Sequence, residues 1–198
     1  MKSIKKITYY LSAIFAFSVA ITGAAFSQPA NQVVISQDTV ISASDTSVDD
    51  FSVIVDGCTL TVEGNHRFES LLLMNGAILT HSANTNAQVY TLDLHVTKDL
   101  IVVPGATINV DGKGYSSGNG PGKGIDGING GGGGYGGDGG NPGMGGSAYG
   151  SLTEPTDMGS GGGSTGGYPY SLGSPGGGAV KLHVARNLVV NGLISANG

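Results

Sequence analysis

The stretch of sequence most suggestive of chemistry is GGYGGD, residues 133–138, which matches the first six positions of a calcium-binding repeat. In that repeat, stacked turns share ions between Asp carboxylates and backbone carbonyls. The chain holds one copy, and Gly140 stands where the repeat requires a bulky apolar residue. Such a match also arises by chance where glycine is abundant. On the strength of this single match, Asp138 is a candidate calcium ligand. No other cofactor is expected.

Two histidines, His95 and His183, occupy the same place in two similar segments of the chain. On adjacent strands they could approach one metal ion. A pair of imidazoles without a third ligand is a poor zinc site. An outward-facing surface position is the simpler interpretation.

The acidic residues outside the glycine-rich part are candidates for acid–base chemistry. A glycoside hydrolase needs two carboxylates roughly 5–10 Å apart across a groove. Here they fall in a polar turn and at scattered outward positions: Asp49, Asp50, Glu63, Glu69, Asp93 and Asp99. Lys98 and Arg186 hold equivalent repeat positions, which indicates a surface row and not a unique catalytic base. No catalytic residue is assigned, and the alternative is a carbohydrate-active parallel β-helix enzyme, a polysaccharide lyase or hydrolase, with calcium dependence as an option.

Five of the eight tyrosines lie in the glycine-rich part: Tyr115, Tyr135, Tyr149, Tyr168 and Tyr170. Aromatic rings separated by glycines can stack on sugar rings or on partner side chains. They are our candidate binding residues. The alternative, that they anchor this part of the chain to the rest, is equally open.

These residues must be positioned by a repeated β pattern. Segments 92–112 and 179–198 align, and shorter echoes lie at 52–65 and 70–84. The aligned pairs are Leu94 with Leu182, His95 with His183, Val96 with Val184, Leu100 with Leu188, and Ile108 with Ile194. Each copy is an apolar run, a tight turn ending in Gly, and a second alternating run. Such a short unit cannot bury its own apolar face, so the copies must stack.

Helical spacing is not sustained after residue 27, so an all-β fold is predicted. Within segment 92–112, Leu92, Leu94 and Val96 should face inward, with Asp93 and His95 outward. The stacking predicts a right-handed parallel β-helix, or solenoid, with a long Gly-rich insertion.

Residues 112–178 differ in composition from these repeats. Residues 111–178 hold thirty of the 37 glycines. So little apolar side chain cannot offset the entropy of ordering a separate core. We expect a flexible or irregular insertion loop, with extended polyglycine-type packing as the alternative.

The organisation that follows has five parts. Residues 1–27 are basic and then apolar, and the sequence AFS before Gln28 predicts a signal peptide cut there. An uncleaved membrane anchor is the alternative, and no membrane span is expected after cleavage. Residues 28–50 should form an N-terminal cap, 51–111 the repeats, 112–178 the insertion, and 179–198 a final, truncated repeat. A fragment of a longer repeat protein is expected.

Removal of the signal peptide leaves six basic and fourteen acidic residues, a net charge of −8. Such a chain would be repelled by phosphates, which disfavours nucleic-acid binding. The single cysteine, Cys58, allows no internal disulfide. Stability should therefore come from stacked strands.

The pairing of a terminal GGGAVKLHVARNLVVNGLISANG block with a Gly-rich insertion resembles the Gly-rich parallel β-helix proteins of bacterial surfaces, such as adhesins and autotransporter-like passengers. The resemblance implies an extracellular stalk or display surface and no catalytic residues. We therefore expect a secreted or cell-surface structural or adhesive protein. Its expected partners are a polysaccharide or a host or neighbouring-cell surface, with self-association through the ends of the solenoid as a further hypothesis.

Overall fold

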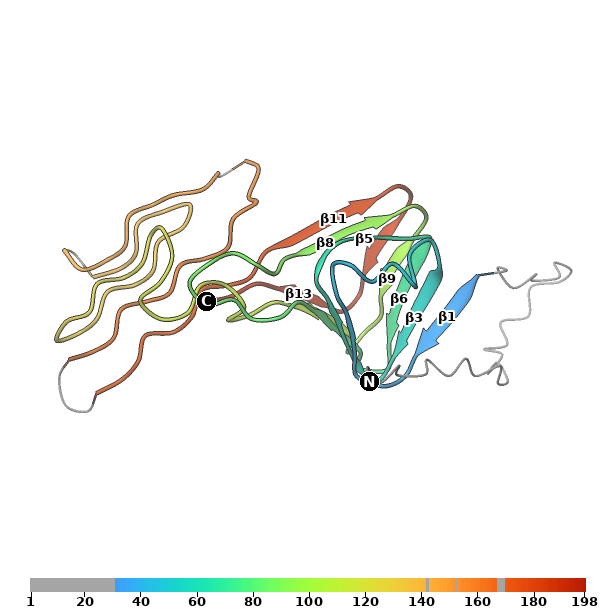
Figure 1. The fold of residues 1–198 in the computed structure, drawn as a ribbon, viewed down its shortest axis with the longest axis horizontal. Coiled ribbons are helices and arrows are strands. Elements are labelled where there is room, and N and C mark those ends of the chain that lie inside the picture. The colour runs from blue at the N-terminus through green and yellow to red at the C-terminus, as the bar shows by residue number, and fades with distance from the viewer. Residues whose placement is uncertain (1–30, 142, 152, 167–169) are drawn as a thin grey trace, which may run out of the picture.

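The computed structural model describes residues 31–141, 143–151, 153–166 and 170–198. Across these residues the chain forms thirteen β-strands and no helix, and every pairing between strands is parallel (Figure 1). The predicted all-β class is confirmed. The predicted signal peptide lies outside the described residues.

Three sheets divide the strands. The first contains β1 (Gln32–Ile35), β3 (Ser52–Asp56), β6 (Ser70–Met74), β9 (Leu100–Val102) and β12 (Leu188–Val190), in that order. The second contains β2 (Thr39–Ile41), β4 (Thr59–Val62), β7 (Ile78–Thr80), β10 (Thr107–Asn109) and β13 (Leu193–Ser195). The third contains β5 (Gly64–Phe68), β8 (Leu92–Val96) and β11 (Val180–Val184). From β3 onward the chain visits the sheets by turns, so each pass lies on the previous one.

The strand register confirms the alignment of the repeats. In β8 and β11, Leu94 pairs with Leu182 and His95 with His183. The remaining expected pairs, Leu100 with Leu188 and Ile108 with Ile194, also face each other. The predicted parity holds in β8, since its first, third and fifth residues are buried while Asp93 and His95 are not. The repeats are therefore stacked passes of the chain.

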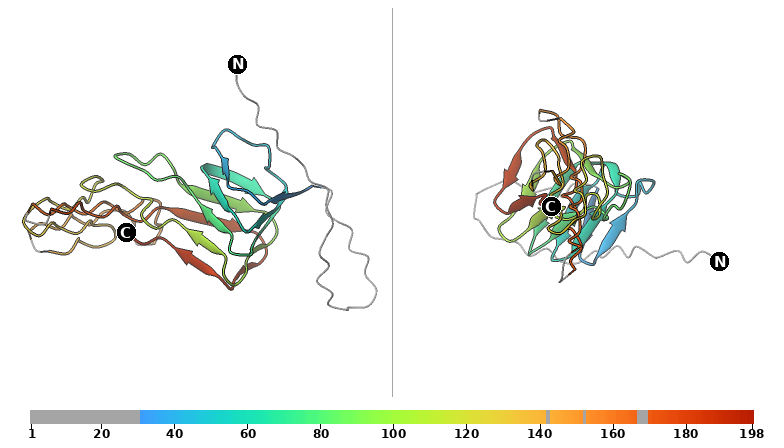
Figure 2. Two further views of the ribbon diagram at one scale, coloured as in Figure 1. Left: turned by 90° about the horizontal axis from the view of Figure 1, so that it is seen from below. Right: turned by 90° about the vertical axis from the view of Figure 1, so that its left-hand side faces the viewer.

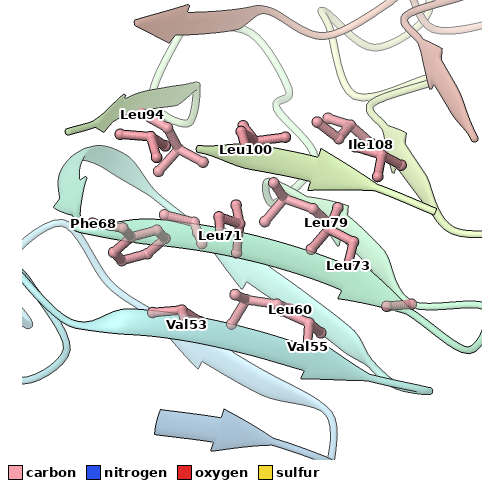
Figure 3. Close-up of a cluster of buried hydrophobic side chains, with 14 of the residues drawn as sticks. Val53, Val55, Leu60, Phe68, Leu71, Leu73, Leu79, Leu94, Leu100 and Ile108 are labelled. Atoms are coloured by element: carbon pink, nitrogen blue, oxygen red, sulfur yellow. The ribbon is translucent and has the colours of Figure 1, made fainter. Parts of the chain in front are cut away.

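Columns of apolar side chains fill the space between the sheets (Figure 3). One column runs through Val53, Leu71 and Leu100, which are paired in successive strands and at most 1 % exposed. Leu60, Leu79 and Ile108 form a second column from the next sheet, and all are fully buried. These branched side chains are stacked in register and removed from water, and the burial of their apolar surface stabilises the stack.

The turns between the first and second sheets depend on glycine for two different reasons. Gly57 and Gly105 have φ of +66° and +85°, a region that favours glycine. Gly192, in the corresponding turn of the last pass, is not left-handed. A Cβ there would lie 2.1 Å from the carbonyl oxygen of Ala106. It is glycine because the previous pass lies too close for any side chain.

The Gly-rich segment, residues 112–178, leaves the stack after β10 and returns before β11. It extends sideways from the stack as a set of adjacent extended stretches (Figure 2). Backbone hydrogen bonds connect these stretches throughout. The described residues of this segment form no named strand, as expected of an irregular insertion, and their hydrogen bonds between adjacent stretches resemble the polyglycine-type alternative.

Candidate binding surface

In the Gly-rich segment, one extended stretch of backbone forms hydrogen bonds with more than two neighbouring stretches. The stretch 131–134 shows this, because it bonds to stretches around Ile125, Gly140, Gly146 and Gly163. A β-strand directs its polar groups to two sides only. An extended chain with three residues per turn directs them to three. We call this arrangement the glycine bundle. It provides hydrogen-bond partners for backbone N–H and C=O groups that a packed loop would otherwise leave unpaired.

Close approach of backbones explains why glycine is so frequent. A Cβ at Gly131 would lie 1.7 Å from the carbonyl oxygen of Met144, and a Cβ at Gly146 would lie 1.8 Å from that of Gly122. Real Cβ atoms do not approach backbone atoms so closely. Conversely, a Cβ at Gly140 would contact nothing within 4 Å. Glycine is thus required at most inner positions of the bundle but not at all of them.

Two of the candidate tyrosines anchor the glycine bundle internally. The rings of Tyr135 and Tyr149 meet edge to face with centroids 5.2 Å apart. The hydroxyl of Tyr149 donates to the carbonyl oxygen of Met158 and accepts from Ser160 Oγ at 3.0 Å. Burial raises the pKa of both tyrosines. These two rings therefore contribute packing, in line with the anchoring alternative.

The other candidate tyrosines are placed differently. Tyr115 is half-buried and its backbone bonds to Gly159 and Gly176. Tyr170 is 67 % exposed. Tyr168 lies outside the described residues. Of the five, Tyr170 is the one that the structure presents to solvent among those it describes.

Tyr170 is one of four exposed large apolar side chains on neighbouring stretches of the glycine bundle, and the other three were not among the candidates from the sequence. Ile125, Ile128 and Leu172 are 54 %, 81 % and 69 % exposed. Two isolated bridges, Gly127 with Thr165 and Thr165 with Ser171, bring their stretches together. We call Ile125, Ile128, Tyr170 and Leu172 the bundle patch. The sequence did offer a signal for these four residues: they are large apolar side chains in a segment that has too few of them to form its own core.

A groove of about 1020 Å³ separates the glycine bundle from the last pass of the stack. Its bundle side is lined by the glycines of residues 130–134 and 176–178 and also by side-chain-bearing residues, among them Tyr135, Pro155 and Asp157. Its other side carries Val180, Leu182 and Ile194. The groove therefore has a glycine-rich wall that also carries aromatic and acidic residues, facing a wall with aliphatic side chains.

The carboxylates considered for catalysis connect successive passes instead. Glu69 accepts a hydrogen bond from Ser52 Oγ at 2.6 Å and pairs with Lys98 Nζ at 2.5 Å. The hydrogen bond from Lys98 is the main cause of the lowered pKa of Glu69. Asp99 Oδ1 accepts from the backbone N and the Nδ2 of Asn187, at 3.1 and 2.8 Å.

The remaining carboxylates of this set follow the same rule: Asp49 contacts His66, Asp50 pairs with Arg67, Glu63 accepts from Ser82, and Asp93 pairs with Lys181. Each partner lies one pass away from its carboxylate. These contacts form an electrostatic ladder along the stack. They give each of the six acidic residues a structural role.

The structure also places the two candidate metal-binding sites, the His95–His183 pair and Asp138. His95 and His183 pair in register with ring centroids 5.7 Å apart on the outer face of the third sheet. Asp138 Oδ1 accepts the backbone N–H of Ala148 at 2.7 Å, so it closes a loop of the bundle. Among the described residues, no group of three or more His, Cys, Asp or Glu side chains could hold a metal ion.

Comparison of the sequence with protein-family models, with curated proteins and with solved structures finds no match. Within the described part of the chain, no helix is long and apolar enough to cross a membrane.

Proposed function

We propose that the chain is an exported structural or adhesive protein without catalytic activity, acting at the cell surface or outside the cell. In this proposal the stacked passes form a right-handed parallel β-helix, and the glycine bundle is its lateral display element. Parallel crossovers are right-handed in about 98 % of cases, which supports the hand. The apolar run and small-residue cleavage pattern of residues 1–27 support export.

The observation that carries the proposal is the bundle patch. Four large apolar side chains, including Tyr170, are each more than half exposed on an element that extends away from the stack. Contiguous exposed apolar surface marks interaction sites, and the two bridges support such a surface here because they hold the stretches of the four residues together. An aromatic ring among aliphatic side chains suits the faces of sugar rings, so we expect the ligand to be a polysaccharide.

Binding can be tested by co-sedimentation of the purified protein with cellulose, chitin and peptidoglycan particles. We expect the protein to pellet with at least one of them. The double variant Tyr170→Ala/Leu172→Ser should lose most of that binding. Val89→Ser is the matched control, because Val89 is 66 % exposed but lies outside the patch.

Two results would overturn the proposal. Equal pelleting of the patch variant and the control would show that the patch does not bind. Release of reducing sugars that survives removal of contaminating enzymes would show catalysis. Export is tested separately, since the exported protein should begin at Gln28 by N-terminal sequencing.

A further inference from the structure

Two histidine side chains on the outer face of the third sheet have ring nitrogens that are free to bind a ligand. His95 and His183 pair in register between β8 and β11. Within the described part of the chain, the two rings contact each other, and neither makes a hydrogen bond or an ion pair. Water or a metal ion can therefore reach both imidazoles.

The outward position of this pair is set by the alternation of the strands. Leu94 and Val96, on either side of His95, are fully buried, whereas His95 is exposed. β8 lies between β5 and β11 (Figure 1), so the place of His95 on this face does not depend on the edge of the sheet. His183 follows from the register.

Neighbouring outward side chains pair between passes, and the two histidines differ from them. Asp93 pairs with Lys181 Nζ at 3.6 Å. Arg67, the register partner of His95 in β5, pairs with Asp50. These contacts join unlike charges, whereas two protonated imidazoles would place like charges opposite each other, which is destabilising. The electrostatic ladder therefore does not account for histidine at both positions.

The spacing of the two rings suits ligation of one ion by both. An imidazole nitrogen bound to a metal lies about 2.0–2.1 Å from the ion, which places the ring centroid roughly 3.2 Å from it. Two rings that share an ion therefore have centroids about 4.5–6.4 Å apart, for angles of about 90–180° at the ion. The observed centroids are 5.7 Å apart, and the ring planes are tilted by 53°. Rotation of these exposed side chains, without movement of the strands, can bring one nitrogen of each ring to a shared ion.

The surroundings of the pair also permit a cation to bind. The positive charges of Arg67 and Lys181 are each paired with a carboxylate, and the whole chain has a formal net charge of −5 at pH 7. Imidazole is a suitable ligand for several divalent transition metals, and among these Cu²⁺ is bound most tightly at a given site. Tetragonal Cu²⁺ accepts a mixture of nitrogen and oxygen ligands, so water can complete its coordination.

We propose that His95 and His183 bind one Cu²⁺ ion on the outer face of the third sheet, with water at the remaining coordination positions. The described residues offer no group of three or more His, Cys, Asp or Glu side chains, so the site is open and its ion exchangeable. Zn²⁺ should bind there more weakly, in line with the poor zinc site expected of two imidazoles. This inference does not depend on the ligand of the bundle patch.

The test is isothermal titration calorimetry of the purified, untagged protein with Cu²⁺ at about pH 7.5, where imidazole is mostly unprotonated. Glycine in the buffer competes for Cu²⁺ and suppresses weak binding to single side chains. We expect one ion per molecule. His95→Gln and His183→Gln should each weaken binding by about tenfold or more, because the second imidazole acts at a high effective concentration. Electron paramagnetic resonance should show two coupled imidazole nitrogens in the parent protein.

A rescue experiment tests the register directly. Arg67→His, added to His183→Gln, would create a new pair of imidazoles in register between β5 and β8 and should restore binding. Arg67 and its partner Asp50 are both exposed, so losing their ion pair costs little stability. Val34→His in the same background is the matched control, since it adds one exposed imidazole on β1 of the first sheet. It should restore nothing, and circular dichroism should show that all variants fold alike.

Three results would overturn the proposal. Absence of binding in the presence of glycine would exclude a site made by two imidazoles. Single variants that bind Cu²⁺ as tightly as the parent protein would place the ion elsewhere on the molecule. Equal rescue by Arg67→His and Val34→His would show that any additional surface histidine is sufficient and that the register of the pair is irrelevant.

Discussion

The imidazole of His81 occupies the space that a side chain at position 178 would need. A Cβ on Gly178 would lie 2.4 Å from His81 Nε2 and 2.9 Å from Lys113 Cβ. His81 is fully buried, and its Nδ1 lies 2.8 Å from the carbonyl oxygen of Ser82. The contact sits where the glycine bundle joins the stack, at Lys113 on the way out and Gly178 on the way back.

Gly178→Ala should lower the free energy of unfolding by about 1–3 kcal/mol, because the buried ring cannot move aside. Thermal unfolding followed by circular dichroism measures this. Gly140→Ala is the control, since a Cβ there meets nothing within 4 Å. In a double-mutant cycle, His81→Ala should remove much of the cost of Gly178→Ala. Additive effects of the two changes would contradict the contact.

The same histidine should make stability depend on pH. Burial lowers the pKa of His81, and the positive charge of Lys113 lowers it further, while the hydrogen bond to Ser82 and the charge of Glu63 oppose this shift. The unfolded chain takes up the proton near pH 6.5. Below that pH the unfolded state binds more protons than the folded state, so the free energy of unfolding falls as pH falls.

Urea unfolding between about pH 7.5 and 5.5 measures this effect, with a limiting slope of about 1.4 kcal/mol per pH unit for one proton. His81→Asn removes the titrating group and should flatten the profile over this range. Three carboxyl groups have a lowered pKa, namely Asp45, Glu69 and Asp111, and they titrate at lower pH, where their protonation destabilises the folded state. Equal slopes for the variant and the parent protein would exclude His81 as the cause.

The loss in free energy of unfolding on truncating a leucine should depend on which pass of the stack contains that leucine. Leu100→Ala should cost about 2–5 kcal/mol, since it leaves a cavity in a packed column. Leu188→Ala, at the paired position, should cost roughly 0.5 kcal/mol or less in the single molecule, because Leu188 is 48 % exposed. Both are measured by urea unfolding at low protein concentration. Similar costs at the two positions would mean that the last pass is covered.

Asp138 should act through its hydrogen bond to Ala148 and not through a cation. Asp138→Ala should destabilise the bundle by about 1 kcal/mol, equally in calcium and in a chelator. Hydrogen exchange at residues 143–148 measures the local effect. A calcium-dependent rise in the melting temperature that is lost in Asp138→Ala would instead support the calcium-binding interpretation of the GGYGGD stretch.

The repeats could be predicted from sequence because their side chains carry the register. Leu94 and Leu182, with the adjacent histidines, align the third sheet, and the alternation in β8 gives the buried face. The different exposure of Leu188 and Leu100 could not be predicted from these patterns, since the two are the same residue at equivalent repeat positions. Exposure distinguishes them, and exposure depends on what lies beyond the last strand.

The glycine bundle could not be predicted because glycine carries no side-chain pattern. Gly132 bonds to Gly140 and to Gly146, and no residue type at these positions specifies those partners. The prediction of a flexible or irregular segment was based on its few apolar side chains. That criterion leaves out backbone hydrogen bonds, which can also order a chain. For the same reason, the sequence could not show that Tyr135 and Tyr149 pack inside the bundle while Tyr170 is exposed to solvent.

The two bodies of this molecule should respond differently to temperature. Unfolding of the stack exposes aliphatic surface and so carries a large positive heat-capacity change, which bends its stability curve and weakens it in the cold. The glycine bundle is held by peptide hydrogen bonds with few apolar side chains, and exposing peptide groups lowers the heat capacity. Its stability curve should be nearly flat, so that cooling weakens the stack while the lateral element keeps its form.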